Sequence, residues 1–106
     1  MTNRFRLASV ILVAASFAVP AIAQGDAAAT YKAKCAMCHG ADGLAATPMG
    51  KSMKIASFKD ASMTGAKDAQ LFASTKNGKG KMPAYAGKLT DEQINDVVKY
   101  IRTLQK

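Results

Sequence analysis

The sequence predicts a small all-α domain of three to four short helices. Three observations support this class. Segments 26–40, 66–78 and 90–106 combine helix-favouring residues with capping signals. Glycines and prolines fall between these segments. No stretch alternates polar and apolar residues in the way that a half-buried strand does.

Residues 1–23 predict a cleavable secretory signal. Two arginines near the start are followed by an uninterrupted run of apolar and small residues at 7–19, and Ala21–Ala23 supplies the small residues of a cleavage site. Thirteen helical residues span about 20 Å, less than the roughly 30 Å of a membrane core, and Pro20 stops the run. We therefore expect cleavage after Ala23, export to the periplasm and a domain that does not span a membrane.

The expected mature domain, residues 24–106, has 83 residues. The whole chain carries a net charge of +8, and removal of the two signal arginines leaves +6. A domain of this size buries little apolar surface and usually needs a disulfide, a metal or a similar staple. Because the chain also lacks tryptophan, we expect something larger than its own side chains to fill the core.

The first predicted helix occupies segment 26–40. Asp26 is the expected N-cap, and the alanines and lysines after it favour helix. Ala27, Tyr31 and Cys35 are spaced by four residues, so they share one face of this helix.

The middle of the chain is less regular. Segment 47–65 contains several helix breakers and predicts at most one short helical turn. Segment 66–78 predicts a helix of about ten residues, with Leu71 and Phe72 facing inward and Gly78 as a left-handed cap.

The last helix is the clearest. Thr90 is the expected N-cap, and Gln93 three residues later completes a capping box. Acidic residues at its start and basic residues at its end complement the helix dipole. One apolar stripe runs along it, formed by Ile94, Val97, Val98, Ile101 and Leu104.

The stretch CAMCHG contains the only cysteines and the only histidine of the chain, Cys35, Cys38 and His39. Four kinds of site use such residues: a disulfide, a thioredoxin-like redox pair, a zinc site and a haem attachment site. Zinc needs four ligands, and the adjacent Cys38 and His39 cannot easily reach one tetrahedral ion. A thioredoxin-like pair belongs to a βαβ fold. A disulfide across two residues removes little unfolded-state entropy.

Covalent haem attachment explains more of the sequence. Cys-x-x-Cys-His is the pattern of c-type attachment, and cysteines three apart place both sulfurs on one side of a turn. The prediction is one haem c with its iron, held by thioethers from Cys35 and Cys38 and by His39 as the proximal ligand. The apolar plane of the haem would also fill the core that this chain cannot fill alone.

The wider pattern resembles the class I cytochromes c, most closely their short bacterial and photosynthetic-type members. Tyr31 lies four residues before the first cysteine, Met82 and Pro83 form a late Met-Pro, and Tyr100 lies in the last helix. The resemblance covers all of residues 24–106. It implies a small class I fold wrapped around one covalently bound haem.

The same resemblance implies that the first and last helices of the domain cross at nearly a right angle. At the crossing, Ala27 and Tyr31 would meet Val97 and Tyr100, and the small side chain of Ala27 would permit a close approach. Tyr31 and Tyr100 are therefore expected to support the haem site.

A single histidine excludes a bis-histidine haem within one chain. The remaining candidates for the sixth ligand are chiefly methionines, namely Met37, Met49, Met53, Met63 and Met82. The resemblance implies Met82 as the distal ligand. It also implies that the carbonyl of Pro48 accepts a hydrogen bond from His39 Nδ1.

Closing both axial positions leaves no place for oxygen, peroxide or a small-molecule substrate. The resemblance therefore implies a one-electron carrier between respiratory or photosynthetic partners, and not an enzyme. The main alternative is a haem enzyme or a gas or redox sensor with an open or exchangeable iron site. A thiol-redox module is the third possibility.

Segment 76–88, which contains Met82, has four lysines and no acidic residue: Lys76, Lys79, Lys81 and Lys88. We expect these lysines to form a docking rim for redox proteins with acidic patches, with Lys51 and Lys54 extending it. The alternative is that the lysines only keep a small domain soluble. Nucleic acid is not an expected partner, and the domain is expected to be a monomer.

Overall fold

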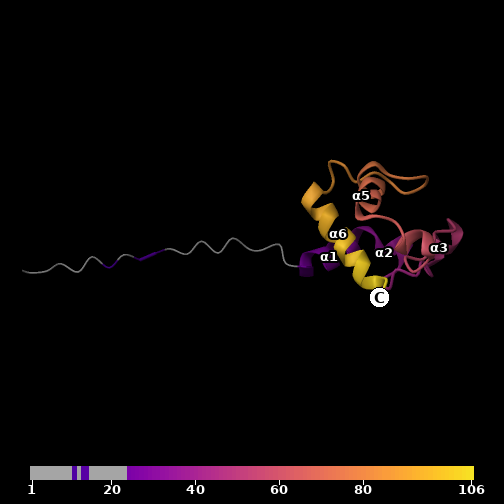
Figure 1. Ribbon diagram of the computed structural model, residues 1–106, viewed down its shortest axis with the longest axis horizontal. Helices are drawn as coiled ribbons and strands as arrows, with labels where there is room; N and C mark the ends of the chain where they lie inside the picture. The colour runs from indigo at the N-terminus through magenta and orange to yellow at the C-terminus, as the bar shows by residue number, and fades with distance from the viewer. Residues whose placement is uncertain (1–10, 12, 15–23) are drawn as a thin grey trace, which may run out of the picture.

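The computed structural model describes residues 11, 13, 14 and 24–106, so the predicted export signal lies almost entirely outside the described residues. Within the described part the chain forms helices and no strand (Figure 1). Three helices are long: α1 (Gln24–Lys34), α5 (Asp68–Asn77) and α6 (Asp91–Leu104). Three have only four or five residues: α2 (Ala36–His39), α3 (Pro48–Ser52) and α4 (Ala61–Thr64). The all-α class is therefore confirmed. None of the helices described is long and apolar enough to cross a membrane.

Helices α1 and α6 cross and pack together, and Figure 1 shows α6 lying across α1. Tyr31 on α1 is 1% exposed, and its ring lies 5.1 Å from that of Tyr100 on α6. Val97 and Ile101 of α6 belong to the same core cluster as Tyr31, and Ala27 is also buried. The expected contact between the first and last helices is thus confirmed.

The start of α6 is the capping box that the sequence predicts. Thr90 Oγ1 accepts a hydrogen bond from the Gln93 amide at 3.1 Å, and Gln93 Oε1 accepts one from the Thr90 amide at 2.8 Å. Four residues of the apolar stripe are buried, and Leu104 is partly buried. Local capping and the buried face therefore agree on where this helix begins and which side faces the core.

The first predicted helix differs from the structure in two ways. Helix α1 begins at Gln24, so the prediction of Asp26 as N-cap is wrong; Asp26 lies in the first turn, where a carboxylate favours the helix dipole. The helix also does not run unbroken to Gly40, because Cys35 separates α1 from α2. The amides of Cys38 and His39 both donate to the Cys35 carbonyl, at 3.2 and 3.0 Å, which tightens the chain at this point.

The middle segment contains two short helices, where the sequence predicted at most one turn. Thr47 caps α3, because its Oγ1 accepts from the Gly50 amide at 2.9 Å. A Cβ on Gly50 would lie 2.5 Å from the carbonyl oxygens of Cys38 and Ala45. Only glycine lets α3 approach α2 this closely, so this contact positions the segment that carries the cysteines.

Candidate functional site

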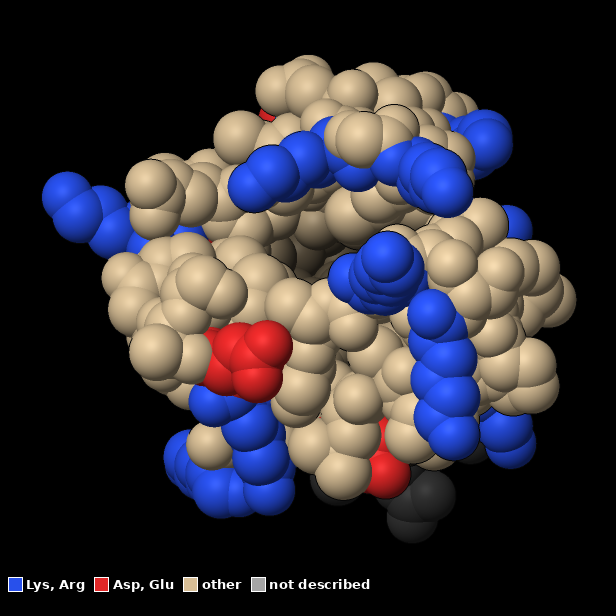
Figure 2. Space-filling view, turned by 90° about the vertical axis from the view of Figure 1, so that its right-hand side faces the viewer, with Lys and Arg blue, Asp and Glu red and all other residues tan. Residues whose placement is uncertain are grey.

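A cavity of about 1050 Å³ lies between the helices, just above the roughly 300–1,000 Å³ typical of ligand and cofactor pockets. Cys35, Cys38 and His39 line it, and so do Met82 and Pro83 from a loop more than forty residues later in the chain. Figure 2 shows a hollow in one face of the molecule with basic side chains around its edge. The fold thus brings all four predicted attachment and axial residues to one cavity.

The backbone of the Cys-x-x-Cys-His segment is fixed by hydrogen bonds to three consecutive carbonyls. Thr47 Oγ1 donates to the Cys38 carbonyl at 2.9 Å, and the Ala45 amide donates to the His39 carbonyl at 2.8 Å. The buried Tyr31 hydroxyl donates to the Gly40 carbonyl at 2.6 Å. Carbonyls at a helix C-terminus have no partner within the helix, so these three bonds hold α2 from outside it.

The two cysteines are not joined by a disulfide, and Cys35 is buried. Burial, with a smaller contribution from neighbouring Cys38, raises the pKa of the Cys35 thiol to about 11. Thiol-redox sites need the opposite shift, because the thiolate is the nucleophile. The burial of Cys35 therefore gives no support to a thiol-redox module.

The His39 ring packs against an aromatic side chain that no sequence pattern predicts. Its ring stacks on Phe58, with centroids 4.6 Å apart and planes inclined by 17°. Burial lowers the pKa of His39, which favours the neutral imidazole, the form that binds metals.

The hydrogen bond expected between His39 Nδ1 and the Pro48 carbonyl is not formed. Nδ1 is buried and has no hydrogen-bond partner among the described residues. Pro48 is instead the first residue of α3, where carbonyls point along the helix axis toward the following turn. The part assigned to Pro48 therefore stays a prediction, and Phe58 is the neighbour found against the imidazole.

The structure separates the five candidate methionines into two groups. Met37 is 76% exposed and Met49 is 40% exposed, and neither lines the cavity. The remaining three, Met53, Met63 and Met82, all line it. Cavity position alone does not choose among these three, so Met82 stays a prediction.

The loop that carries Met82 is anchored at both sides of the cavity. Lys79 and Met82 exchange backbone hydrogen bonds of 3.2 and 3.0 Å. The Tyr85 amide donates to the Thr75 carbonyl in α5 at 3.0 Å. The Tyr85 hydroxyl donates to the carbonyl of Lys34, at the end of α1, at 2.9 Å. Tyr85 therefore ties the Met82 loop to the residue that precedes Cys35.

Gly78 permits the entry of this loop. Its φ of 79° with ψ of 164° is not the left-handed helical cap that the sequence predicted, because the chain leaves α5 in an extended direction. A Cβ on Gly78 would lie 2.8 Å from the Met82 carbonyl oxygen.

Replacing Gly78 with alanine is expected to destabilise the protein by about 2 kcal/mol or more, since the side chain adds a steric clash to the roughly 1–2 kcal/mol penalty of its positive φ. Gly80→Ala is the matched control, because Gly80 also has a positive φ of 56° but a Cβ there meets nothing within 4 Å. Chemical denaturation of both variants measures the difference. Equal losses would mean that the contact with Met82 has no energetic effect.

The lysines that line the cavity are not the same set as the lysines that lie close together in the sequence. Lys79 and Lys81 line the cavity, together with Lys54 and with Lys34, which the sequence analysis did not single out. Lys76 and Lys88 are not among the lining residues. Lys76 forms an ion pair with Asp91 at 3.0 Å, and the Lys88 ammonium lies 5.8 Å from the centre of the Tyr85 ring.

Three residues of the site were therefore missed: Phe58, Tyr85 and Lys34. Tyr85 follows Met82-Pro83 closely in the chain, and Lys34 directly precedes Cys35, so both lie next to a motif that the sequence does indicate. Phe58 stacks on His39, which lies nineteen residues earlier in the chain, and no local sequence pattern predicts that contact.

These residues fit a covalently bound haem. The cavity combines two thiols three residues apart, a neutral imidazole beside the second one, and a lining that also includes Leu71, Ile55 and three methionines. Cys35 and Cys38 would hold the porphyrin, and His39 would bind its iron.

The chain is similar to c-type cytochromes of known sequence and structure. The family model described as "Cytochrome C oxidase, cbb3-type, subunit III" matches residues 23–101. Cytochrome c6 of Nostoc sp. is 35% identical, with 90% of this chain and 85% of the relative covered. Cytochrome c6 of Porphyra purpurea is 37% identical, with 88% of each covered. The solved structure of the KustC0563 c-type cytochrome is 27% identical with a TM-score of 0.69, covering 76% of this chain and 98% of that one.

Proposed function

Because this chain belongs to the family of class I c-type cytochromes, which are electron-transfer proteins, we propose that it is an exported one-electron carrier with His39 and Met82 as axial ligands. The covalently bound haem c of this family supplies the Fe(II)/Fe(III) couple. The observation that carries the proposal is the meeting of Cys35, Cys38, His39 and Met82 at one cavity.

The chain's own residues favour fast electron transfer with little rearrangement. The hydrogen bonds to three consecutive carbonyls hold the attachment segment, and the Tyr85 hydroxyl holds the opposite loop against it. A soft thioether from Met82 would favour Fe(II), and the buried surroundings would also oppose the extra charge of Fe(III).

A spectrum of the purified protein tests this function. We expect reduced c-type bands that persist after acid–acetone extraction, and a spectrum that carbon monoxide does not readily change. Loss of the haem on extraction would contradict covalent attachment. A ready shift with carbon monoxide would instead support a haem enzyme or sensor with an open iron site.

We further propose cleavage after Ala23 and export to the periplasm, on the basis of the signal pattern in residues 1–23. Mass spectrometry of the periplasmic fraction should show a chain that starts at Gln24 and carries one haem. An intact Met1 in a cytoplasmic fraction would contradict the proposal. Gel filtration should give the size of a monomer.

We also propose that basic residues at the cavity mouth dock an acidic patch on a redox partner. Lys34, Lys54, Lys79 and Lys81 line the cavity, and Figure 2 shows basic side chains around the hollow. Lys76 and Lys88 lie outside this lining, so their part in docking is expected to be smaller. Clustered charge of one sign steers an oppositely charged partner and increases the association rate.

The association rate should therefore fall steeply with salt, since the screening length drops from about 10 Å at 0.1 M to about 3 Å at 1 M. Lys79→Glu or Lys81→Glu should slow reduction by the native partner by roughly tenfold or more at low salt, within the 10–10³-fold range of electrostatic steering. Lys106→Glu is the control, because Lys106 lies beyond the end of α6 and does not line the cavity. Stopped-flow kinetics across salt measure these effects, and equal effects from all three substitutions would leave the lysines as solubilising surface.

A further inference from the structure

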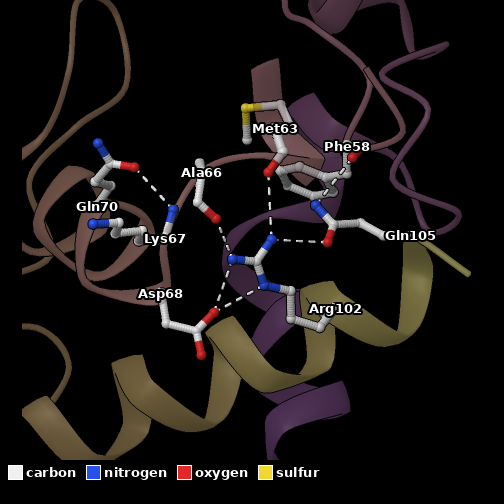
Figure 3. A network of polar contacts seen from close by, with 8 residues as sticks. All are labelled: Phe58, Met63, Ala66, Lys67, Asp68, Gln70, Arg102 and Gln105. Carbon is white, nitrogen blue, oxygen red and sulfur yellow. Dashed lines mark hydrogen bonds and ion pairs between the residues drawn. The ribbon is translucent and has the colours of Figure 1, made fainter. Parts of the chain in front are cut away.

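Arg102, near the C-terminal end of α6, binds the backbone of a segment that lines the cavity. Arg102 Nη1 donates to the Met63 carbonyl at 3.3 Å, and Nη2 donates to the Ala66 carbonyl (Figure 3). Nε donates to Asp68 Oδ1 at 2.9 Å, and Nη1 donates to Gln105 Oε1 at 3.0 Å. One side chain thus contacts the end of α4, the α4–α5 connection and the first turn of α5.

We expect the hydrogen bonds from Arg102 to backbone carbonyls to contribute more to stability than its ion pair with Asp68. Met63 and Ala66 lie at and just beyond the C-terminal end of α4, and the Met63 carbonyl also accepts a hydrogen bond from the Ala66 amide at 3.3 Å. The planar guanidinium, with its five donors, can satisfy several such acceptors at once. Asp68 is 71% exposed, so its ion pair alone contributes little, whereas the Arg102 side chain is 27% exposed.

Gln105, at the same end of α6, makes a similar contact on the side of the cavity where His39 lies. Gln105 Nε2 donates to the Phe58 carbonyl at 3.0 Å, and Figure 3 shows Gln105 reaching Phe58 beside Arg102. Phe58 is the buried residue whose ring stacks on His39. Arg102 and Gln105 therefore hold both ends of segment 58–68. Between those ends, the segment contributes five residues to the cavity wall: Ala61, Ser62, Met63, Gly65 and Ala66.

We propose that Arg102 and Gln105 are positioning residues for the electron-transfer site. By fixing segment 58–68, they keep the Phe58 ring against the His39 imidazole and keep the cavity wall closed to water. The inference rests on the proposed function, because it concerns the orientation of His39 as an iron ligand and the solvent exposure that helps to set the reduction potential.

The test compares Arg102→Met, Arg102→Lys and Gln105→Ala in the full-length holoprotein. Lys99→Met is the matched control, because Lys99 is an exposed residue of the same helix and carries the same charge. Two quantities are measured: amide hydrogen exchange at Phe58, Thr64 and Gly65, whose amides are hydrogen-bonded, and the midpoint potential.

We expect exchange at these amides to rise by roughly tenfold or more in both Arg102 variants, since losing about 1.4 kcal/mol of hydrogen bonding changes a local opening equilibrium tenfold. Gln105→Ala should affect Phe58 most. Exchange at Val97 and Val98 within α6 should stay near wild type. The potential should fall in Arg102→Lys as well as in Arg102→Met, and the proton resonances of the His39 ring should shift in both.

Other results would overturn the inference. Exchange that rises equally in segment 58–68 and in α6, with an unchanged potential, would mean that Arg102 only stabilises the fold. A potential that falls equally in Arg102→Met and Lys99→Met, but not in Arg102→Lys, would mean that only charge matters. A wild-type protein without a reversible one-electron couple would instead refute the proposed function, whatever the variants do.

Discussion

Replacing both Cys35 and Cys38 with alanine is expected to leave a chain with little helical circular dichroism signal. The described core is small, and its cluster consists of Tyr31, Cys35, Phe58 and two α6 residues. Next to that cluster lies a cavity of about 1050 Å³. Without a covalently attached haem the apolar lining of this cavity has nothing to pack against, and a domain of this size has little stability to lose.

Circular dichroism and mass spectrometry of the exported double variant measure this loss. Met37→Ala is the matched control, because Met37 lies between the two cysteines but is exposed. The control should keep its haem and its native helicity. Native-like helicity in the double variant without haem would show that the polypeptide core folds alone.

Replacing Met82 with alanine is expected to remove the weak charge-transfer band at the red edge of the ferric spectrum and to open the iron to carbon monoxide. The potential should fall by on the order of 0.1 V or more, within the roughly 0.8 V over which axial ligands tune haem proteins. Removing a soft thioether withdraws the ligand that favours Fe(II). Absorption spectroscopy and potentiometry measure both effects.

Met53→Ala and Met63→Ala are the decisive comparisons, because both methionines line the same cavity as Met82. They should keep the charge-transfer band and lose only packing energy, about 2–5 kcal/mol for a buried methionine and less where the side chain is partly exposed. If one of them loses the band while Met82→Ala keeps it, the distal ligand has been assigned to the wrong methionine.

The last helix and its contact with α1 were the most predictable parts of the fold. Helix α6 has two independent signals, a Thr90–Gln93 capping box and a continuous apolar stripe, and both agree with the structure. The Tyr31–Tyr100 contact followed from the family resemblance and is also present. Where local and long-range preferences agree, sequence is a reliable guide.

The less predictable features depend on contacts between distant segments. The break between α1 and α2 at Cys35 is not predicted by a glycine or a proline. It lies where the amides of Cys38 and His39 both donate to the Cys35 carbonyl. The stacking of Phe58 on His39 joins a buried loop residue to α2, and no periodicity signals such a pair. The resemblance assigned Pro48 a hydrogen bond from His39 Nδ1, and no described residue is bonded to that nitrogen.

The positions of the lysines around the cavity were also hard to predict from the sequence. Proximity in sequence grouped Lys76 and Lys88 with the Met82 loop, yet neither lines the cavity. Lys34, nearly fifty residues before Met82, does line it, because Tyr85 brings the loop to the end of α1. Which charges surround the cavity mouth is therefore a property of the fold and not of any one segment.

The contact between α1 and α6 also determines how this chain reaches its fold. Tyr31 and Tyr100 are nearly seventy residues apart in the chain, so joining them closes a loop that contains every residue of the cavity. Closing a flexible loop of that length costs about 4 kcal/mol of chain entropy, from (3/2)RT ln n. Contacts of such large sequence separation slow folding, because the entropy is lost before the contacts form. We therefore expect the encounter between α1 and α6 to be a slow step in the folding of this protein.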